Sequence, residues 1–130
     1  MDPDGAIAVL RAAVDELFNA GQLGWCIPPT RVFAETLLAR GGQADLREAQ
    51  AAIERLAAAP ADEGLVIRDI WLLRLRALLA RARGDAAPYA HFRDRYRDMA
   101  KSLGFDGHID WAEAMPTAFS RGDFAQLVSK

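Results

Sequence analysis

Apolar residues recur along the chain with spacings of three, four and three residues, and this pattern appears three times. Successive sets start at Ile7, Leu46 and Tyr89, about 40 residues apart. At about 100° per residue, each set forms one narrow stripe on a helix. The sets are Ile7, Leu10, Val14 and Leu17; Leu46, Ala49, Ile53 and Leu56; and Tyr89, Phe92, Tyr96 and Met99. We therefore predict three amphipathic helices of one design, which is typical of a helical repeat.

A second helix follows each of these, after a short link that contains glycine or proline. The first of these second helices opens at Pro28 and stops at Gly41. The next runs over residues 65–83, and the last lies around residues 108–115, before Pro116. Links this short favour antiparallel neighbours. The sequence thus predicts an all-α fold of three antiparallel helix hairpins, stacked as a tetratricopeptide-like α-α array over residues 1–116. Residues 117–130 predict a short C-terminal helical tail, either a capping helix over the last hairpin or an occupant of a neighbour's groove.

The predicted helices differ in how much of their surface is apolar. Residues 65–83 are apolar almost all round, so we place this helix at the centre of the stack. The helix over residues 89–103 has a polar back instead, which is typical of a solvated outer face. That back carries Arg93, Asp94, Arg95, Arg97, Asp98 and Lys101.

Composition supports helices and argues against a nucleic-acid surface. Alanine, the best helix former, supplies 26 of the 130 residues. Arginine outnumbers lysine 14 to 2, but 18 acidic residues leave a net charge of −2. Because Asp85, Asp94 and Asp98 interrupt the arginines of residues 74–97, we predict intramolecular ion pairs there. Nucleic acid is therefore the disfavoured partner.

The single cysteine and the lengths of the apolar runs bear on the cellular compartment. The one cysteine, Cys26, stands between Trp25 and Ile27, which predicts a buried, inert thiol and excludes an internal disulfide. No apolar run approaches the ~20 residues of a membrane span. We expect a cytoplasmic protein that does not associate with membranes.

Residues 108–113 gather the most chemistry in one place. Asp110 and Glu113 have the i,i+3 spacing of two metal ligands, but His108 lies beside neither. We therefore predict that His108 begins the helix near Asp106 and that Trp111 fills the core. No serine has a convincing pair of histidine and acid partners nearby in sequence. The sequence predicts no catalytic residue, no metal site and no cofactor.

Residues 69–85, DIWLLRLRALLARARGD, resemble the closing region of a family of large actinobacterial proteins. The resemblance continues through Tyr89 and residues 93–96, 99–100, 102–105, 107–109 and 111–115, and covers roughly residues 30–116. In that family a class III nucleotide cyclase domain precedes an ATPase domain and a long tetratricopeptide-like region. The resemblance implies a helical regulatory or scaffold segment. Neither the cyclase's metal-binding aspartates nor a phosphate-binding loop has a match here, so no cyclase chemistry is implied.

The chain departs from the tetratricopeptide pattern in two respects. That pattern has a period near ~34 and a small residue at the eighth position of its first helix. Here the period is 39 to 43, and the corresponding positions hold Arg11, Gln50 and Arg93. The hairpins are therefore expected to splay wider or to pack in another register.

These observations favour a non-catalytic interaction or regulatory module. In stacked hairpins the first helices line the concave side, where their polar flanks meet partners. The predicted partner-binding residues are Asp15, Glu16, Arg47, Glu54, Arg55, Asp94, Arg97 and Asp98. The expected partner is a protein, in particular a cyclase or ATPase domain. The alternatives are a small nucleic-acid-binding adaptor that uses the arginine strips, and a homo-oligomerisation domain.

Overall fold

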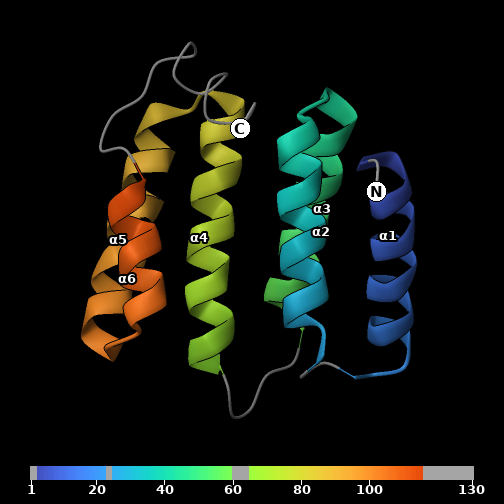
Figure 1. Ribbon diagram of the computed structural model, residues 1–130, viewed down its shortest axis with the longest axis horizontal. Helices are drawn as coiled ribbons and strands as arrows, with labels where there is room; N and C mark the ends of the chain where they lie inside the picture. Colours follow the sequence, from blue (N-terminus) through green and yellow to red (C-terminus); the bar gives the residue numbers. More distant parts are fainter. Residues whose placement is uncertain (1–2, 23–24, 60–64, 116–130) are drawn as a thin grey trace.

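The computed structural model describes residues 3–22, 25–59 and 65–115, and this part of the chain contains six α-helices and no strand (Figure 1). They are α1 (Pro3–Asn19), α2 (Ile27–Arg40), α3 (Gln43–Ala58), α4 (Leu65–Arg83), α5 (Ala86–Leu103) and α6 (Asp106–Ala114). The prediction of an all-α fold is confirmed. The predicted tail, 117–130, lies outside the described residues.

Each helix packs antiparallel against the next one along the chain, and α4 also packs against α2. Figure 1 shows α4 between the α2–α3 pair and the α5–α6 pair. The hydrophobic core has two parts, and α4 contributes to both: Leu72, Leu75 and Leu79 belong to the part shared with α1, α2 and α3, while Ile70 and Ala77 belong to the part shared with α5 and α6. The central position predicted for residues 65–83 is confirmed.

The three predicted apolar stripes face this core. Val14, Ile53 and Tyr96 are buried, and every other member of the three sets is buried or half-buried. The helices that carry these stripes are α1, α3 and α5. As the spacing indicated, each of them is stabilised by burying its apolar side against neighbouring helices.

Two expectations about burial in α4 and α5 are wrong. The first turn of α4 is not buried, because Val66 and Ile67 are 43% and 50% exposed and belong to neither part of the core. Arg93, expected on the solvated back of α5, is buried instead. Its Nε donates to the Met115 carbonyl at 3.2 Å and its Nη1 donates to Asp94 at 2.7 Å. The end of α6 accounts for the difference, since its last carbonyls need donors.

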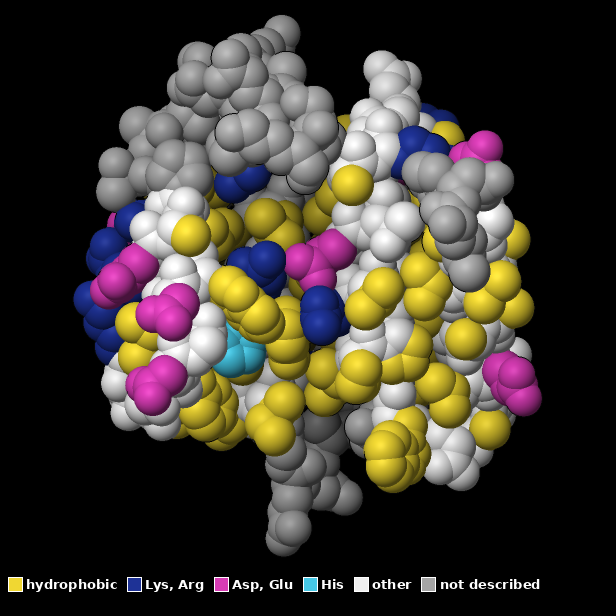
Figure 2. Space-filling model, in the orientation of Figure 1, with side chains coloured by type: hydrophobic (Ala, Val, Ile, Leu, Met, Phe, Trp, Pro, Cys, Tyr) yellow, Lys and Arg dark blue, Asp and Glu magenta, His cyan; other side chains and the backbone are white. Residues whose placement is uncertain are grey.

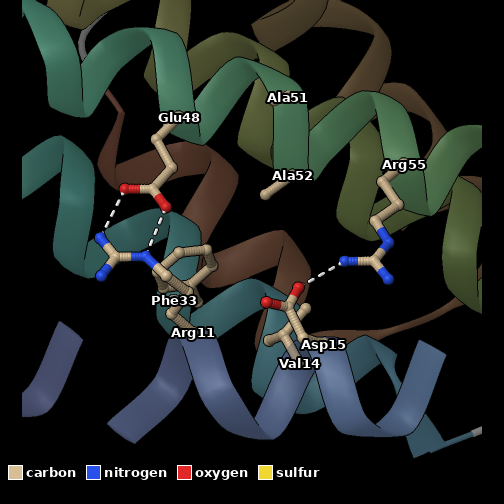
Figure 3. A pocket seen from close by; sticks show the side chains of 8 residues that line it. All are labelled: Arg11, Val14, Asp15, Phe33, Glu48, Ala51, Ala52 and Arg55. Carbon is tan, nitrogen blue, oxygen red and sulfur yellow. Dashed lines mark hydrogen bonds and ion pairs between the residues drawn. The ribbon is translucent and has the colours of Figure 1, made fainter. Parts of the chain in front are cut away.

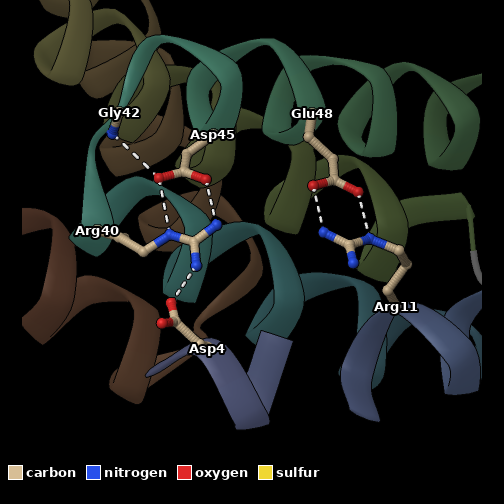
Figure 4. A network of polar contacts seen from close by, with 6 residues as sticks. All are labelled: Asp4, Arg11, Arg40, Gly42, Asp45 and Glu48. Carbon is tan, nitrogen blue, oxygen red and sulfur yellow. Dashed lines mark hydrogen bonds and ion pairs between the residues drawn. The ribbon is translucent and has the colours of Figure 1, made fainter. Parts of the chain in front are cut away.

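One arginine ties the ends of three helices together (Figure 4). Arg40, at the end of α2, donates through Nε and Nη2 to the Asp45 carboxylate at 2.9 and 2.6 Å, and it also pairs with Asp4 of α1. Asp45 accepts a third hydrogen bond from the backbone N–H of Gly42 at 3.1 Å. Gly41, which follows Arg40, ends α2 with a φ of 74°, a conformation that glycine adopts without strain. The α2–α3 turn is therefore fixed by both backbone and charge.

We expect this network to make the free energy of unfolding depend on pH in the acidic range. The Arg40 hydrogen bonds hold the pKa of Asp45 below its usual value, so its stabilising effect is present above an unfolded pKa of about 4 and is lost as the pH falls through the lower folded value. Asp45→Asn should lower the urea midpoint at pH 7, and this difference from the natural sequence should shrink towards pH 2.5. Asp4→Asn, at the exposed end of the same network, is the control and should have a smaller effect. A difference that stays constant with pH would contradict the assignment.

Candidate functional site

A pocket of about 200 Å³ opens between α1 and α3 (Figure 3). Val14 of α1, Phe33 of α2 and Ala52 of α3 form its apolar part, and all three are buried. Arg11, Asp15, Glu48, Ala51 and Arg55 complete the lining. Of the predicted partner-binding residues, Asp15 and Arg55 are thus brought together at one site between two first helices.

Two ion pairs bridge α1 and α3 across this pocket. Arg11 donates through Nε and Nη2 to the two Glu48 oxygens at 2.7 and 2.8 Å. The Arg55 Nη1 donates to Asp15 at 2.6 Å, and its guanidinium also lies 4.3 Å from the centre of the Phe18 ring. The four charges cancel, so the pocket offers an apolar floor between two neutral pairs of donors and acceptors. Such a surface suits a side chain with an apolar body and a polar tip.

The other predicted partner-binding residues lie in two further places. Arg47 and Glu54 are exposed on α3, one turn to either side of the pocket residue Ala51, and therefore flank the pocket. Glu16 is exposed on α1 but does not line the pocket.

The three predicted residues on α5 lie away from the pocket, beyond α4 (Figure 1). Arg97 pairs there with Asp94 and with Asp98, each at 3.7 Å. The predicted ion pairing of these residues is confirmed, but the structure does not join them to Asp15 and Arg55.

The sequence reasoning missed Arg11, Glu48 and Phe33 in this pocket. A usable signal existed for the first two. Arg11 and Glu48 are 37 residues apart and Asp15 and Arg55 are 40 apart, close to the offset of 39 between the first two apolar stripes. Opposite charges separated by one repeat length are candidates for pairing between neighbouring repeats.

A second cluster, also missed, joins α2, α4 and α6. Glu35 of α2 accepts hydrogen bonds from Arg31 and from Arg74 of α4, both at 3.1 Å. The Arg31 guanidinium lies 4.6 Å from the centre of the Trp71 ring, and the Arg74 guanidinium lies 5.0 Å from that of Trp111. Each arginine therefore combines an ion pair with a cation–π contact.

The histidine of residues 108–113 belongs to this cluster. His108 Nδ1 lies 2.6 Å from the Tyr96 hydroxyl, and its ring contacts those of Trp71 and Trp111. Burial lowers the pKa of His108, and the charges of Arg74 and Arg31 lower it further. The neutral imidazole is thus favoured. Trp111 does not fill the core as expected: its ring contacts Trp71, Arg74 and His108 but remains 42% exposed.

Cys26 behaves as predicted. It is fully buried, its Sγ donates to the Gln22 carbonyl at 3.3 Å, and burial raises the pKa of its thiol. A buried thiol with a raised pKa holds little of the reactive thiolate.

Two kinds of feature are absent from the described residues. No helix among them is both long enough and apolar enough to cross a membrane. Nor do they contain a group of three or more histidine, cysteine, aspartate or glutamate side chains placed to hold a metal ion.

Comparison with known proteins adds no relative. No protein-family model, no curated protein and no solved structure matches the chain.

Proposed function

We propose that this chain is a non-catalytic interaction module, built as a tetratricopeptide-like stack of three helix hairpins, that binds a protein partner through the face of α1 and α3. The observation that carries the proposal is the pocket with an apolar floor between these two helices. Exposed charges of Arg47 and Glu54 flank it. Apolar area surrounded by polar groups is the usual composition of a protein-binding surface.

Contacts between equivalent positions support the stacked arrangement. Glu35 and Arg74, which are in contact, are 39 residues apart, the offset between the first two apolar stripes. Trp71 of α4 likewise contacts His108 and Trp111 of α6, 37 and 40 residues further along. Second helices of successive hairpins therefore lie beside one another, as the first helices α1 and α3 do. Stacks of this kind present extended surfaces to partners.

Long polar side chains occupy the positions where tetratricopeptide repeats have small residues. Arg11 pairs with Glu48, Gln50 accepts a hydrogen bond from Arg83, and Arg93 bonds to the end of α6. Side-chain hydrogen bonds between helices thus take the place of the close packing of helix backbones that small residues allow. This supports a stack that is wider than the tetratricopeptide pattern.

The resemblance of residues 69–115 suggests the partner. We propose a cyclase or ATPase domain of a class III nucleotide cyclase system, with catalysis in that partner. The test is isothermal titration of this chain with each purified domain. A transient interface of this kind should bind with a Kd of about 1–100 μM.

A pair of charge reversals tests the position of the interface. Glu54→Arg alters the flank of the pocket, whereas Asp110→Arg makes the same change at an exposed position of α6. We expect Glu54→Arg to weaken binding about tenfold and Asp110→Arg to leave it within about twofold. Equal effects of the two variants would move the interface elsewhere. Absence of binding to either domain, together with concentration-dependent dimers in light scattering, would favour the homo-oligomerisation function instead.

A further inference from the structure

The second cluster forms a surface that the proposed partner-binding face does not use. We call it the arginine–tryptophan face and define it by Arg31 and Glu35 of α2, Trp71 and Arg74 of α4, and Trp111 of α6. Figure 2 shows basic, acidic, histidine and apolar side chains gathered in the middle of the molecule's front, where α2, α4 and α6 lie nearest the viewer in Figure 1. This surface lies on second helices, whereas the α1–α3 pocket lies mainly on first helices.

Positive charge is in excess on this face. Two guanidinium groups share the single carboxylate of Glu35, which leaves a surplus of one positive charge. Each arginine has five N–H donors, but Glu35 accepts one bond from each of them. Arg74 also hydrogen-bonds Tyr96, and its Nε is buried beneath the surface. The capacity to donate hydrogen bonds to another anion therefore lies in the outer N–H groups of the two arginines, above all those of Arg31, whose side chain is 34% exposed.

The indole rings make that capacity directional. Arg31 stacks on Trp71 and Arg74 stacks on Trp111, so each planar fork is held in place instead of moving freely. An arginine whose fork is already oriented loses less entropy when it binds a carboxylate. Trp111 is also 42% exposed, and Ile67 lies one turn before Trp71 on α4 with half of its surface exposed. Apolar contact area is thus available beside the donors.

We propose that the arginine–tryptophan face binds an acidic peptide segment of a partner protein, with a carboxylate bridging Arg31 and Arg74 and an adjacent aromatic or aliphatic side chain resting on Trp111. Tryptophan and arginine together are the residues that contribute most to protein–protein binding. A nucleic acid fits this face less well, because the face has a surplus of one positive charge, whereas binding to a nucleic acid depends on several basic contacts to successive phosphates. The inference does not depend on the α1–α3 pocket.

The test is a fluorescence titration with a capped octapeptide of alternating glutamate and phenylalanine. It uses the full chain with Trp25→Phe, so that the two remaining tryptophans, Trp71 and Trp111, both report on this face. The comparison probes are the same peptide with glutamine in place of glutamate and a 12-base-pair DNA duplex. We expect the glutamate peptide to bind at least about tenfold more tightly than the glutamine peptide, since hydrogen bonds to a charged group are the stronger kind.

Three variants separate binding from folding. Arg31→Gln should weaken peptide binding about tenfold, whereas Arg95→Gln, which removes the same charge at an exposed position of α5, should change it less than about twofold. Glu35→Gln removes the competing carboxylate and should tighten binding about threefold or more. A cluster that serves only to hold the helices together does not predict this gain. Equal binding of the two peptides, weaker binding by Glu35→Gln, or tighter binding of the duplex would each overturn the proposal.

Discussion

Leu75→Ala is expected to lower the free energy of unfolding by about 2–5 kcal/mol, a large part of the ~5–15 kcal/mol that stabilises a typical domain. Leu75 is fully buried in the middle of α4, in the part of the core shared with α1, α2 and α3. Its removal would leave a cavity that the surrounding helices fill only in part. Because α4 also contributes to the second part of the core, loosening it should affect both halves of the molecule.

Urea unfolding followed by circular dichroism gives this free energy. The control is Leu103→Ala, the same substitution at the end of α5, where the side chain is 38% exposed. We expect it to cost under about 1 kcal/mol. A single transition in the natural sequence that splits into two in Leu75→Ala would show that α4 couples the two halves. A loss no larger than that of Leu103→Ala would contradict the central position of α4.

The helices were predictable because each carries its own signal. Ile53 and Tyr96 fall on stripes whose burial follows from spacing alone, and Gly41 marks an end because few other residues adopt its positive φ. Such signals are local, and a single amphipathic helix reveals them before its neighbours are known.

The candidate sites were less predictable because they depend on pairs between repeats. The pattern placed Asp15 and Arg55 on polar flanks, but it did not show that they bind each other. Arg93 has the sequence surroundings of a solvated residue and is buried only because the end of α6 lies over it. Arg31 and Trp71 stack on one another from helices about 40 residues apart. The periodicity within one helix holds no information about contacts between helices. The offset between repeats only limits which residues of neighbouring repeats can pair.

Tyr96 connects the second part of the core to the arginine–tryptophan face, and two substitutions separate these roles. Tyr96→Ala removes a fully buried ring and should cost about 3–5 kcal/mol. Tyr96→Phe keeps the ring and removes only the hydroxyl that lies 2.6 Å from His108 Nδ1, and should cost about 1–2 kcal/mol. Tyr89→Phe is the comparison, because it removes the hydroxyl of an equally buried ring in the same part of the core whose hydrogen bond is with Arg81 and not with His108.

The same substitution should alter the dependence of stability on pH. The lowered pKa of His108 means that the unfolded chain takes up a proton at a higher pH than the folded one, so stability falls as the pH drops below an unfolded value of about 6.5 until the folded pKa is reached. We expect the Tyr96 hydroxyl, which also accepts from Arg74, to donate its proton to Nδ1, and a bond in that direction favours the neutral ring. Tyr96→Phe should therefore raise the pKa of His108 and flatten this fall. An NMR titration in a His91→Gln background, where His108 is the one remaining histidine, measures the shift, and an unchanged pKa would show that the hydroxyl has no such effect.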